Sequence, residues 1–339
     1  MKITWATTTA NDYDNLNTLS GGNIYDKMSF ETLKKYYNLE LLHIKRPKPR
    51  TLIKNIYKTY LFYKSLRNIN YSGRILILDN ISLAFVNKKP GIKTIAVLHH
   101  IDNNILLSWK NLYLKRKFYD NLRNTDIIIT VSQYWLKEFR DLGCRDVRVI
   151  YNPFDVSRFV IKEEKVFEFK TRYNIPLNKP LIYLGNCREE KGVMESYEQL
   201  KDIDACLITS GTKNIHLPVI NLHLNYDDYL LLLKSSTIVL TMSKMTEGWC
   251  RTAHEAMLCG TPVIGSGTGG MKELLQDGKQ IICEKFDDLQ SIVTKLLNNK
   301  EMRNKMGLDG RELASSFSLE KFENDWKDVI NTLAKKYDC

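Results

Sequence analysis

The chain has 339 residues, enough for two domains of about 150 residues each, and its 43% hydrophobic and 26% charged residues are typical of a soluble globular protein. No apolar run approaches the roughly 18–20 residues of a membrane span, the N-terminal sequence lacks a signal peptide's apolar segment, and the seven cysteines include no Cys-x-x-Cys pair. We therefore expect a cytoplasmic protein without a disulfide or zinc framework, and its net charge of +11 predicts an anionic partner.

The first half of the chain alternates short apolar runs with helical patterns, as in a series of βα units. This alternation predicts an α/β fold with a parallel sheet. Strands are predicted at Ile3–Ala6, Leu39–Ile44, Ile75–Leu78, Thr94–Leu98, Asp126–Val131 and Val147–Ile150.

Two features in this half are candidates for a functional site. Gly21 and Gly22 precede a helical pattern, and glycines at a helix start let backbone amides approach an anion closely. His99 and His100 follow the strand at 94–98, at the carboxyl edge where open α/β sheets bind ligands. A glycine pair can also form a mere turn, and a histidine at a strand end is often structural.

Basic residues are concentrated between Leu41 and Arg67, where eight lysines and arginines occur without an acidic residue. Within Leu52–Leu61, apolar and polar residues fall on opposite sides of a helical wheel, which is typical of a basic helix that binds an anionic membrane surface. Trp109–Phe118 has the same character. The alternative is that both helices pack on the first sheet with solvated lysines. No recognised nucleic-acid motif accompanies them, so we expect no nucleic acid partner.

The second half of the chain restarts the same alternation. Strands are predicted at Leu181–Leu184, Ala205–Thr209, Thr237–Thr241 and Pro262–Gly265. The segment at 151–176 has few apolar clusters and two prolines, and it marks a domain boundary. We assign residues 1–160 to a first domain, 161–316 to a second domain and 317–339 to a C-terminal helix with one apolar face.

The most informative segment is Thr246–Leu275, where a helix is predicted at Trp249–Cys259, ending at Gly260. Glu247 and Glu255 are separated by seven residues across the start of this helix.

The start of this predicted helix suits a phosphorylated ligand. The amides of Trp249, Cys250 and Arg251 are unpaired donors at a helix N-terminus, a site for a diphosphate. Glu247 precedes them and can accept hydrogen bonds from sugar hydroxyls. Glu255 lies two turns into the helix and can accept from both hydroxyls of a ribose.

This segment resembles the Glu-x7-Glu motif of the retaining nucleotide-sugar glycosyltransferases of family 4, which have the GT-B fold. The match covers Glu-Gly at 247–248, Glu-Ala-Met at 255–257, Gly-Thr-Pro-Val-Ile at 260–264, Gly-Gly at 269–270 and Glu273. The resemblance is clear over about residues 125–330 and loose over 1–124.

A second match lies at Leu181–Gly192, which is similar to the family's strand–turn–helix that holds the donor diphosphate with an arginine and a lysine. Lys191 and Gly192 match the family's Lys-Gly. Asn186 stands where the family usually carries arginine, and Arg188 is the candidate to replace it.

The resemblance implies two Rossmann-like domains facing each other across a cleft, with the C-terminal helix crossing back to the first domain. It implies catalytic roles for Glu247, Lys191 and His99 or His100, of which His99 fits better because it directly follows the strand. It implies donor binding by Gly21, Gly22, Asn186, Arg188, Lys191, Glu247, Gly248, Trp249, Cys250, Arg251 and Glu255.

The expected reaction moves a sugar from a nucleoside-diphosphate sugar to a hydroxyl acceptor, with retention. We expect no cofactor and no metal, because Lys191 supplies the positive charge and the Asp-x-Asp at 202–204 simply precedes a predicted strand. The family and the basic stretch favour a glycan or lipid-linked acceptor and a peripheral location on the inner face of the cell membrane. The alternatives are a sugar phosphorylase or nucleotide-sugar epimerase of the same fold, and a non-catalytic basic binding protein.

Overall fold

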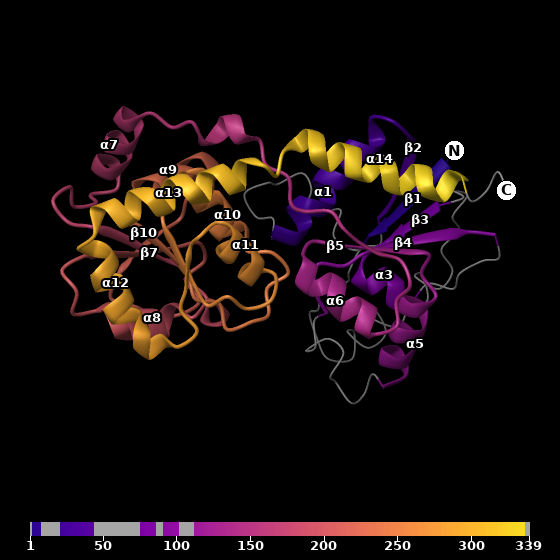
Figure 1. Cartoon of the computed structure of the whole chain (residues 1–339), viewed down its shortest axis with the longest axis horizontal. Helices are drawn as coiled ribbons and strands as arrows, with labels where there is room; N and C mark the ends of the chain where they lie inside the picture. Colours follow the sequence, from indigo (N-terminus) through magenta and orange to yellow (C-terminus); the bar gives the residue numbers. More distant parts are fainter. Residues whose placement is uncertain (1, 8–20, 44–74, 86–90, 102–111, 336–339) are drawn as a thin grey trace, which may run out of the picture. The chain divides into compact units, whose positions relative to one another are not determined.

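The computed structural model describes residues 2–7, 21–43, 75–85, 91–101 and 112–335 (Figure 1). Contacts within the chain separate two units, Met1–Tyr151 with Glu320–Cys339, and Asn152–Leu319. In the described residues, each unit has one parallel sheet of six strands covered by helices, which confirms the predicted α/β class. The division falls after Tyr151, before the predicted boundary at 160. Within the second unit the Phe154 amide donates to the Phe317 carbonyl.

The first sheet has the strand order β2-β1-β3-β4-β5-β6. Its elements are β1 (Lys2–Thr7), α1 (Gly21–Lys34), β2 (Asn38–His43), β3 (Ile75–Leu78), α3 (Asn80–Phe85), β4 (Lys93–Val97), α5 (Leu112–Arg123), β5 (Ile127–Thr130), α6 (Gln133–Asp141), β6 (Val147–Val149) and α14 (Leu319–Lys335). All six predicted strands of this half are present. The order reverses between β1 and β3, which makes the carboxyl ends of these strands the switch point of the sheet.

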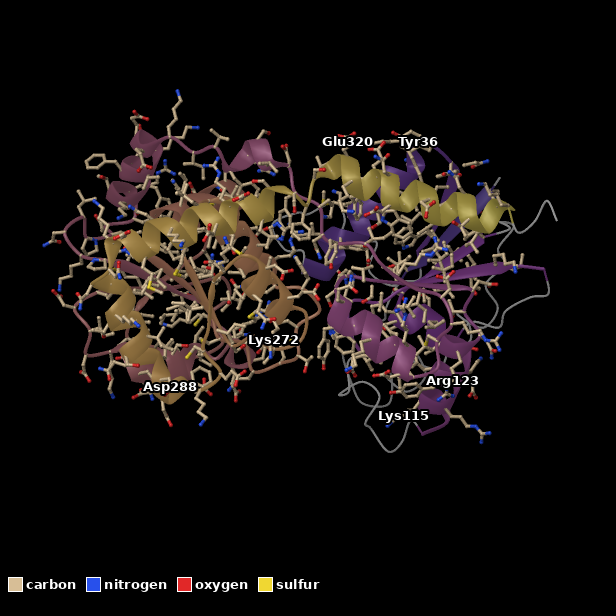
Figure 2. The ribbon with its side chains drawn as sticks, viewed as in Figure 1. Tyr36, Lys115, Arg123, Lys272, Asp288 and Glu320 are labelled. Atoms are coloured by element: carbon tan, nitrogen blue, oxygen red, sulfur yellow. The ribbon has the colours of Figure 1, made fainter. Side chains whose placement is uncertain are left out.

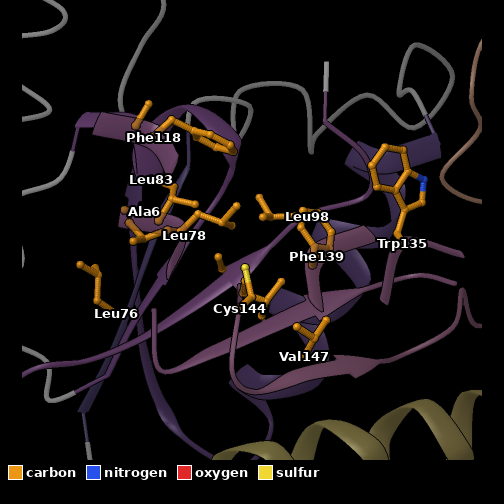
Figure 3. Close-up of a cluster of buried hydrophobic side chains, with 14 residues drawn as sticks. Ala6, Leu76, Leu78, Leu83, Leu98, Phe118, Trp135, Phe139, Cys144 and Val147 are labelled. Carbon is orange, nitrogen blue, oxygen red and sulfur yellow. The ribbon is translucent and has the colours of Figure 1, made fainter. Parts of the chain in front are cut away.

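Helices cover both faces of this sheet (Figure 1). Leu76 and Leu78 of β3 point toward α3, α5 and α6, where Phe118 and Phe139 fill a buried cluster (Figure 3). On the opposite face, Trp5 of β1 packs against α14, with its ring 6.1 Å from that of Trp326. Both faces of the strands are therefore buried, as is typical of a parallel sheet.

The C-terminal helix α14 buries the whole apolar face that its sequence predicts. The residues on that face are Phe322, Trp326, Val329, Ile330 and Leu333. The Phe322 ring meets Tyr25 of α1 edge-on at 5.5 Å, so α14 packs within the first unit.

The second sheet has the strand order β12-β11-β10-β7-β8-β9. Its unit contains α7 (Glu163–Arg172), β7 (Leu181–Asn186), α8 (Val193–Leu200), β8 (Cys206–Ser210), β9 (Ile220–Leu222), α9 (Tyr226–Ser235), β10 (Ile238–Thr241), α10 (Arg251–Leu258), β11 (Val263–Gly265), α11 (Met271–Asp277), β12 (Ile281–Ile282), α12 (Leu289–Leu297) and α13 (Lys300–Ser315), with 3-10 turns at Val156–Phe159, Glu189–Lys191 and Phe286–Asp288. The four predicted strands are present. Strands β9 (three residues) and β12 (two residues) were not predicted.

This order is that of a Rossmann fold, with its switch point between β7 and β10. Helices α8 and α12 cover one face of the sheet, and α9 and α10 cover the other (Figure 1). Helix α10 ends at Leu258, and the predicted left-handed residue Gly260 follows its C-cap with φ +74°. The Thr261 amide donates to the Ala256 carbonyl in a Schellman motif. The two units thus have Rossmann-like folds.

Candidate functional site

The switch point of the second sheet brings together the two residues that the sequence motifs single out. Strand β7 leads into the 3-10 turn that ends with Lys191, and β10 leads into the loop that carries Glu247. Lys191 Nζ donates to Glu247 Oε1 at 2.6 Å. Ligands of open α/β sheets bind at this edge, so the paired charges stand where a ligand is expected.

Glycines hold the two loops that carry this pair. Gly192 has φ +66°, and a Cβ on it would lie 2.2 Å from the Met242 carbonyl oxygen. Gly269 has φ +59°, and a Cβ there would lie 2.3 Å from the Glu247 carbonyl oxygen. The same oxygen accepts from the Gly270 amide at 2.9 Å. The glycines at 192 and 269 are therefore required by close backbone approach as well as by positive φ.

The pair keeps a positive charge available for an anion. Burial alone would lower the pKa of Lys191, but the Glu247 carboxylate raises it above its usual value. An ammonium group has three N–H donors, so the contact with Glu247 leaves others for a phosphate oxygen. The adjacent Cys250 stays a thiol, because burial and then the Glu247 carboxylate raise its pKa to about 12.

Helix α10 begins later than predicted, at Arg251, with Cys250 as its N-cap. Gly248 and Trp249 precede it in the loop. The amides of Cys250 and Arg251 therefore lie at the start of the helix, as predicted for an anion site, whereas the amide of Trp249 does not. Trp249 lies before the helix, and its indole N–H donates to His254 Nδ1 at 3.1 Å. The helix start can still offer unpaired amides to an anion.

Glu255 is held by side chains that the sequence did not single out for this purpose. Its Oε1 lies 3.1 Å from Arg251 Nη2 and accepts from Tyr226 Oη at 3.0 Å. Arg251 also donates to Asn152 Oδ1 at 3.2 Å and stacks on the Phe154 ring. Burial raises the pKa of Glu255, against the opposing effects of Arg251 and Tyr226. The sequence predicted a role for the Arg251 amide, whereas the structure shows a contact of its guanidinium with Glu255. The spacing of the two residues, one helical turn apart, is the sequence feature that indicates such a contact.

Asn186 and Arg188 lie on the same connection but have different surroundings. Asn186 Oδ1, at the end of β7, accepts from Tyr183 Oη at 3.3 Å and from Ser210 Oγ at 3.2 Å. The Arg188 side chain is half exposed, with Nη1 at 3.8 Å from Glu190 Oε1. Whether Arg188 replaces an arginine at 186 therefore stays a prediction.

In the first unit, the structure brings the predicted glycine pair and histidine together. Gly21 and Gly22 open α1, and a Cβ on Gly22 would lie 3.2 Å from His99 Cδ2. His99 Nε2 lies 3.1 Å from Oδ1 of Asp26, a residue that sequence reasoning missed although it stands one turn after Gly22. Burial raises the pKa of Asp26, while His99 lowers it. The neighbouring His100 ring lies instead near Trp135, at 6.4 Å between centroids.

His254 joins three parts of the second unit. Its Nδ1 accepts from Trp249, its Nε2 donates to the Ala314 carbonyl at 3.0 Å, and the Phe154 ring stacks on it at 4.1 Å. Burial lowers the pKa of His254 to about 3. The imidazole is therefore neutral at physiological pH, and it positions the loop that precedes α10.

Of the predicted basic segments, the one between Leu41 and Arg67 lies outside the described residues from position 44 onward. The second, Trp109–Phe118, is described from 112 onward as part of α5, where Phe118 is buried in the core. Lys115 and Arg123 lie on the same helix (Figure 2).

Within the described residues, no helix is long and apolar enough to cross a membrane. No group of three or more His, Cys, Asp or Glu side chains in those ranges is placed to hold a metal ion.

Two family models together match most of the chain. The model of the glycosyl transferases group 1 matches residues 167–313, and that of glycosyltransferase family 4 matches residues 28–158. The N-acetyl-alpha-D-glucosaminyl L-malate synthase of Bacillus anthracis is 28% identical over 261 residues, which are 70% of this chain and 67% of the relative.

Solved structures of similar fold cover almost the whole chain. Sucrose-phosphate synthase from Thermosynechococcus elongatus superposes with a TM-score of 0.78 at 14% identity, over 99% of this chain and 100% of that one. Anabaena HepE in complex with UDP-glucose superposes with a TM-score of 0.73 at 15% identity, over 98% of this chain and 100% of that one. The fold is therefore GT-B, with two Rossmann-like domains.

We predict that His254 makes stability depend on pH. In the unfolded chain its imidazole takes up a proton near pH ~6.5, whereas the folded protein resists protonation down to about 3. Its contribution is fully present above pH ~6.5 and is lost as pH falls toward 3, by up to roughly 1.4 kcal/mol per pH unit. Urea unfolding of the wild type and His254→Gln across this range measures the difference.

The control for this experiment is His216→Gln, which removes an exposed imidazole of the same unit. Its free energy of unfolding should run parallel to that of the wild type. A His254→Gln variant that also runs parallel would show that the buried imidazole is not the source of the pH dependence.

We also predict that Gly192→Ala costs more stability than Gly260→Ala. Both glycines have positive φ, but a Cβ at 260 meets its nearest atom at 3.9 Å and a Cβ at 192 meets the Met242 oxygen at 2.2 Å. We expect a loss of roughly 1–2 kcal/mol at 260 and about 2–5 kcal/mol at 192, because strain and overpacking add. Equal losses in urea unfolding would refute the close approach.

Proposed function

Because the chain belongs to the glycosyl transferases of group 1, family 4, we propose that it moves a sugar from a nucleoside-diphosphate sugar to a hydroxyl acceptor with retention at the anomeric carbon. The observation that carries this proposal is the contact of Lys191 with Glu247 beside the start of α10. A cation and helix amides suit a diphosphate, and a carboxylate suits sugar hydroxyls. The complex of Anabaena HepE with UDP-glucose supports a donor of this class.

In the proposed reaction, the bond from the anomeric carbon to the diphosphate oxygen breaks and a bond to the acceptor oxygen forms on the same face. The diphosphate leaves with the electron pair of the broken bond, and its departing oxygen takes up the proton that the acceptor hydroxyl gives up. Lys191 and the amides at the start of α10 stabilise the negative charge on the leaving group, with Arg188 as a further candidate cation. Glu255, anchored by Arg251 and Tyr226, offers its carboxylate to the ribose.

We predict that Lys191→Ala lowers kcat/KM for sugar transfer by roughly 10²–10³, because charge on the leaving diphosphate loses its cation. The matched control is Lys201→Ala, which removes an exposed lysine paired with Glu198 at 2.7 Å in the same unit.

A thermal-shift screen with nucleoside diphosphates and their sugars first identifies the donor, since a ligand at 100 times its Kd raises the free energy of unfolding by about 2.7 kcal/mol. Lys191→Ala should lose most of that shift and Lys201→Ala none.

The same assay separates this function from its alternatives. Transfer that persists in EDTA supports the proposed metal independence, and the anomeric coupling in a proton NMR spectrum of the product reports retention. Phosphate-dependent turnover would indicate a sugar phosphorylase, and isomerised donor without acceptor would indicate an epimerase. Wild-type donor binding and transfer by both Lys191→Ala and Glu247→Ala would rule out the proposed site.

We further propose that the acceptor is a lipid-linked or surface-glycan precursor and that the protein binds the inner face of the membrane peripherally. The support is the sequence between Leu41 and Arg67, with eight basic residues and no acidic one. Juxtamembrane basic residues each contribute about 1 kcal/mol of attraction to an anionic surface.

We predict that replacing Lys45, Arg46, Lys48 and Arg50 by Gln weakens binding to phosphatidylglycerol-containing vesicles at least about tenfold. Vesicle sedimentation measures the binding, and added salt should weaken it for the wild type because it screens surface charge. The control replaces the same number of exposed lysines in the second unit, namely Lys213, Lys272, Lys295 and Lys300. Equal losses in the two variants would show that net charge, rather than this segment, is responsible.

A further inference from the structure

His99 is enclosed by one face of helix α1. Gly22, Tyr25 and Asp26 stand at i, i+3 and i+4, which places them side by side on the helix. The Gly22 backbone approaches the ring, Tyr25 meets it edge-on at 5.0 Å, and Asp26 Oδ1 lies 3.1 Å from Nε2. Each residue of this face therefore limits where the imidazole can lie.

The helix that makes these contacts is itself anchored in the core. Tyr25 is fully buried, and its hydroxyl donates to the Ile150 carbonyl at 2.9 Å. Ser29 Oγ donates to the Tyr25 carbonyl at 2.9 Å. Because Tyr25 and Asp26 are adjacent, this anchoring also fixes the backbone from which the carboxyl group extends.

We infer that Asp26 is a positioning residue for His99, holding the Nε2 proton so that Nδ1 is kept as a hydrogen-bond acceptor for a substrate hydroxyl. An ionised Asp26 only accepts hydrogen bonds, so in that state its 3.1 Å contact with Nε2 places the proton on that nitrogen. A neutral imidazole with one protonated nitrogen accepts at the other. The inference rests on the proposed function for the identity of the substrate.

The burial of the two side chains fits this role. The Asp26 side chain is 10% exposed and that of His99 is 19% exposed, so the carboxyl lies deeper than the ring. A buried carboxyl is costly, and an apolar residue of similar size would stabilise a purely structural position at least as well. The remaining exposure of the imidazole leaves part of it accessible to a ligand at the carboxyl end of β4.

The first test reads the ring directly and needs no enzyme activity. In protein labelled with ¹⁵N at its six histidines, the His99 signals are assigned by their loss in His99→Gln. We expect a proton on Nε2 and none on Nδ1 when the ring is neutral, and loss of this preference in Asp26→Asn, whose amide can also donate. A wild-type ring protonated on Nδ1 instead would overturn the inference, because Asp26 would then be the donor.

The second test measures turnover with the donor found by thermal shift. Asp26→Asn should lower kcat by roughly ten- to a hundredfold with a smaller change in KM, since without a fixed Nε2 proton the ring no longer presents Nδ1 as an acceptor for the substrate hydroxyl in the transition state. In a His99→Gln background the same substitution should have almost no further effect. Glu31→Gln, which removes an exposed carboxylate from the same helix, is the matched control and should leave kcat unchanged.

The outcomes separate this inference from the proposed function. Equal losses of kcat in the two backgrounds would show that Asp26 acts independently of His99. Losses in both donor hydrolysis and transfer would assign the hydroxyl to the donor sugar, and a loss in transfer alone would assign it to the acceptor. If the wild type transferred no sugar, the proposed function would fail while the ring protonation would still decide whether Asp26 orients His99.

Discussion

The contact of Lys191 with Glu247 is the interaction on which the candidate site depends, and it exists because two backbone segments approach where no side chain fits. Gly192 lies against the Met242 carbonyl, and Gly269 lies against that of Glu247. These approaches set the loops that follow β7 and β10, the strands that flank the switch point of the second sheet. A cation and a carboxylate from distant parts of the sequence are thereby held at hydrogen-bonding distance.

The first unit uses a related arrangement at its own sheet edge. A glycine of α1 lies against the ring of His99, which follows β4, and the carboxyl of Asp26 pairs with that ring. In both units a glycine allows a helix or turn to lie close to the segment that follows a strand. In both, a buried carboxyl contacts a basic side chain: Asp26 contacts His99, and Glu247 contacts Lys191. In each pair the contact offsets part of the cost of burying the carboxyl, and removing one partner would leave that group without its compensation.

Neutral and charged groups have separate tasks around α10. His254 is neutral and buried, and it ties Trp249, Phe154 and the Ala314 carbonyl together, which fixes the loop before the helix. Arg251, the first residue of α10, forms an ion pair with the Glu255 carboxylate. The imidazole thus connects the loop before the helix to the rest of the unit, and the ion pair orients the carboxylate inside the helix.

The sequence alone determined the fold class, ten of the strands and the apolar face of α14, because βα alternation and helical periodicity are local signals. It also predicted Lys191, Glu247 and His99 as site residues, through the resemblance of the motifs around them to those of the family. It did not identify Asp26 or Tyr226, nor the side-chain role of Arg251, and it began α10 at Trp249. Those features depend on which side chains meet once the chain is packed. Only the tertiary structure brought Lys191 to Glu247 and Asp26 to His99, because such contacts depend on backbone approach between segments far apart in sequence.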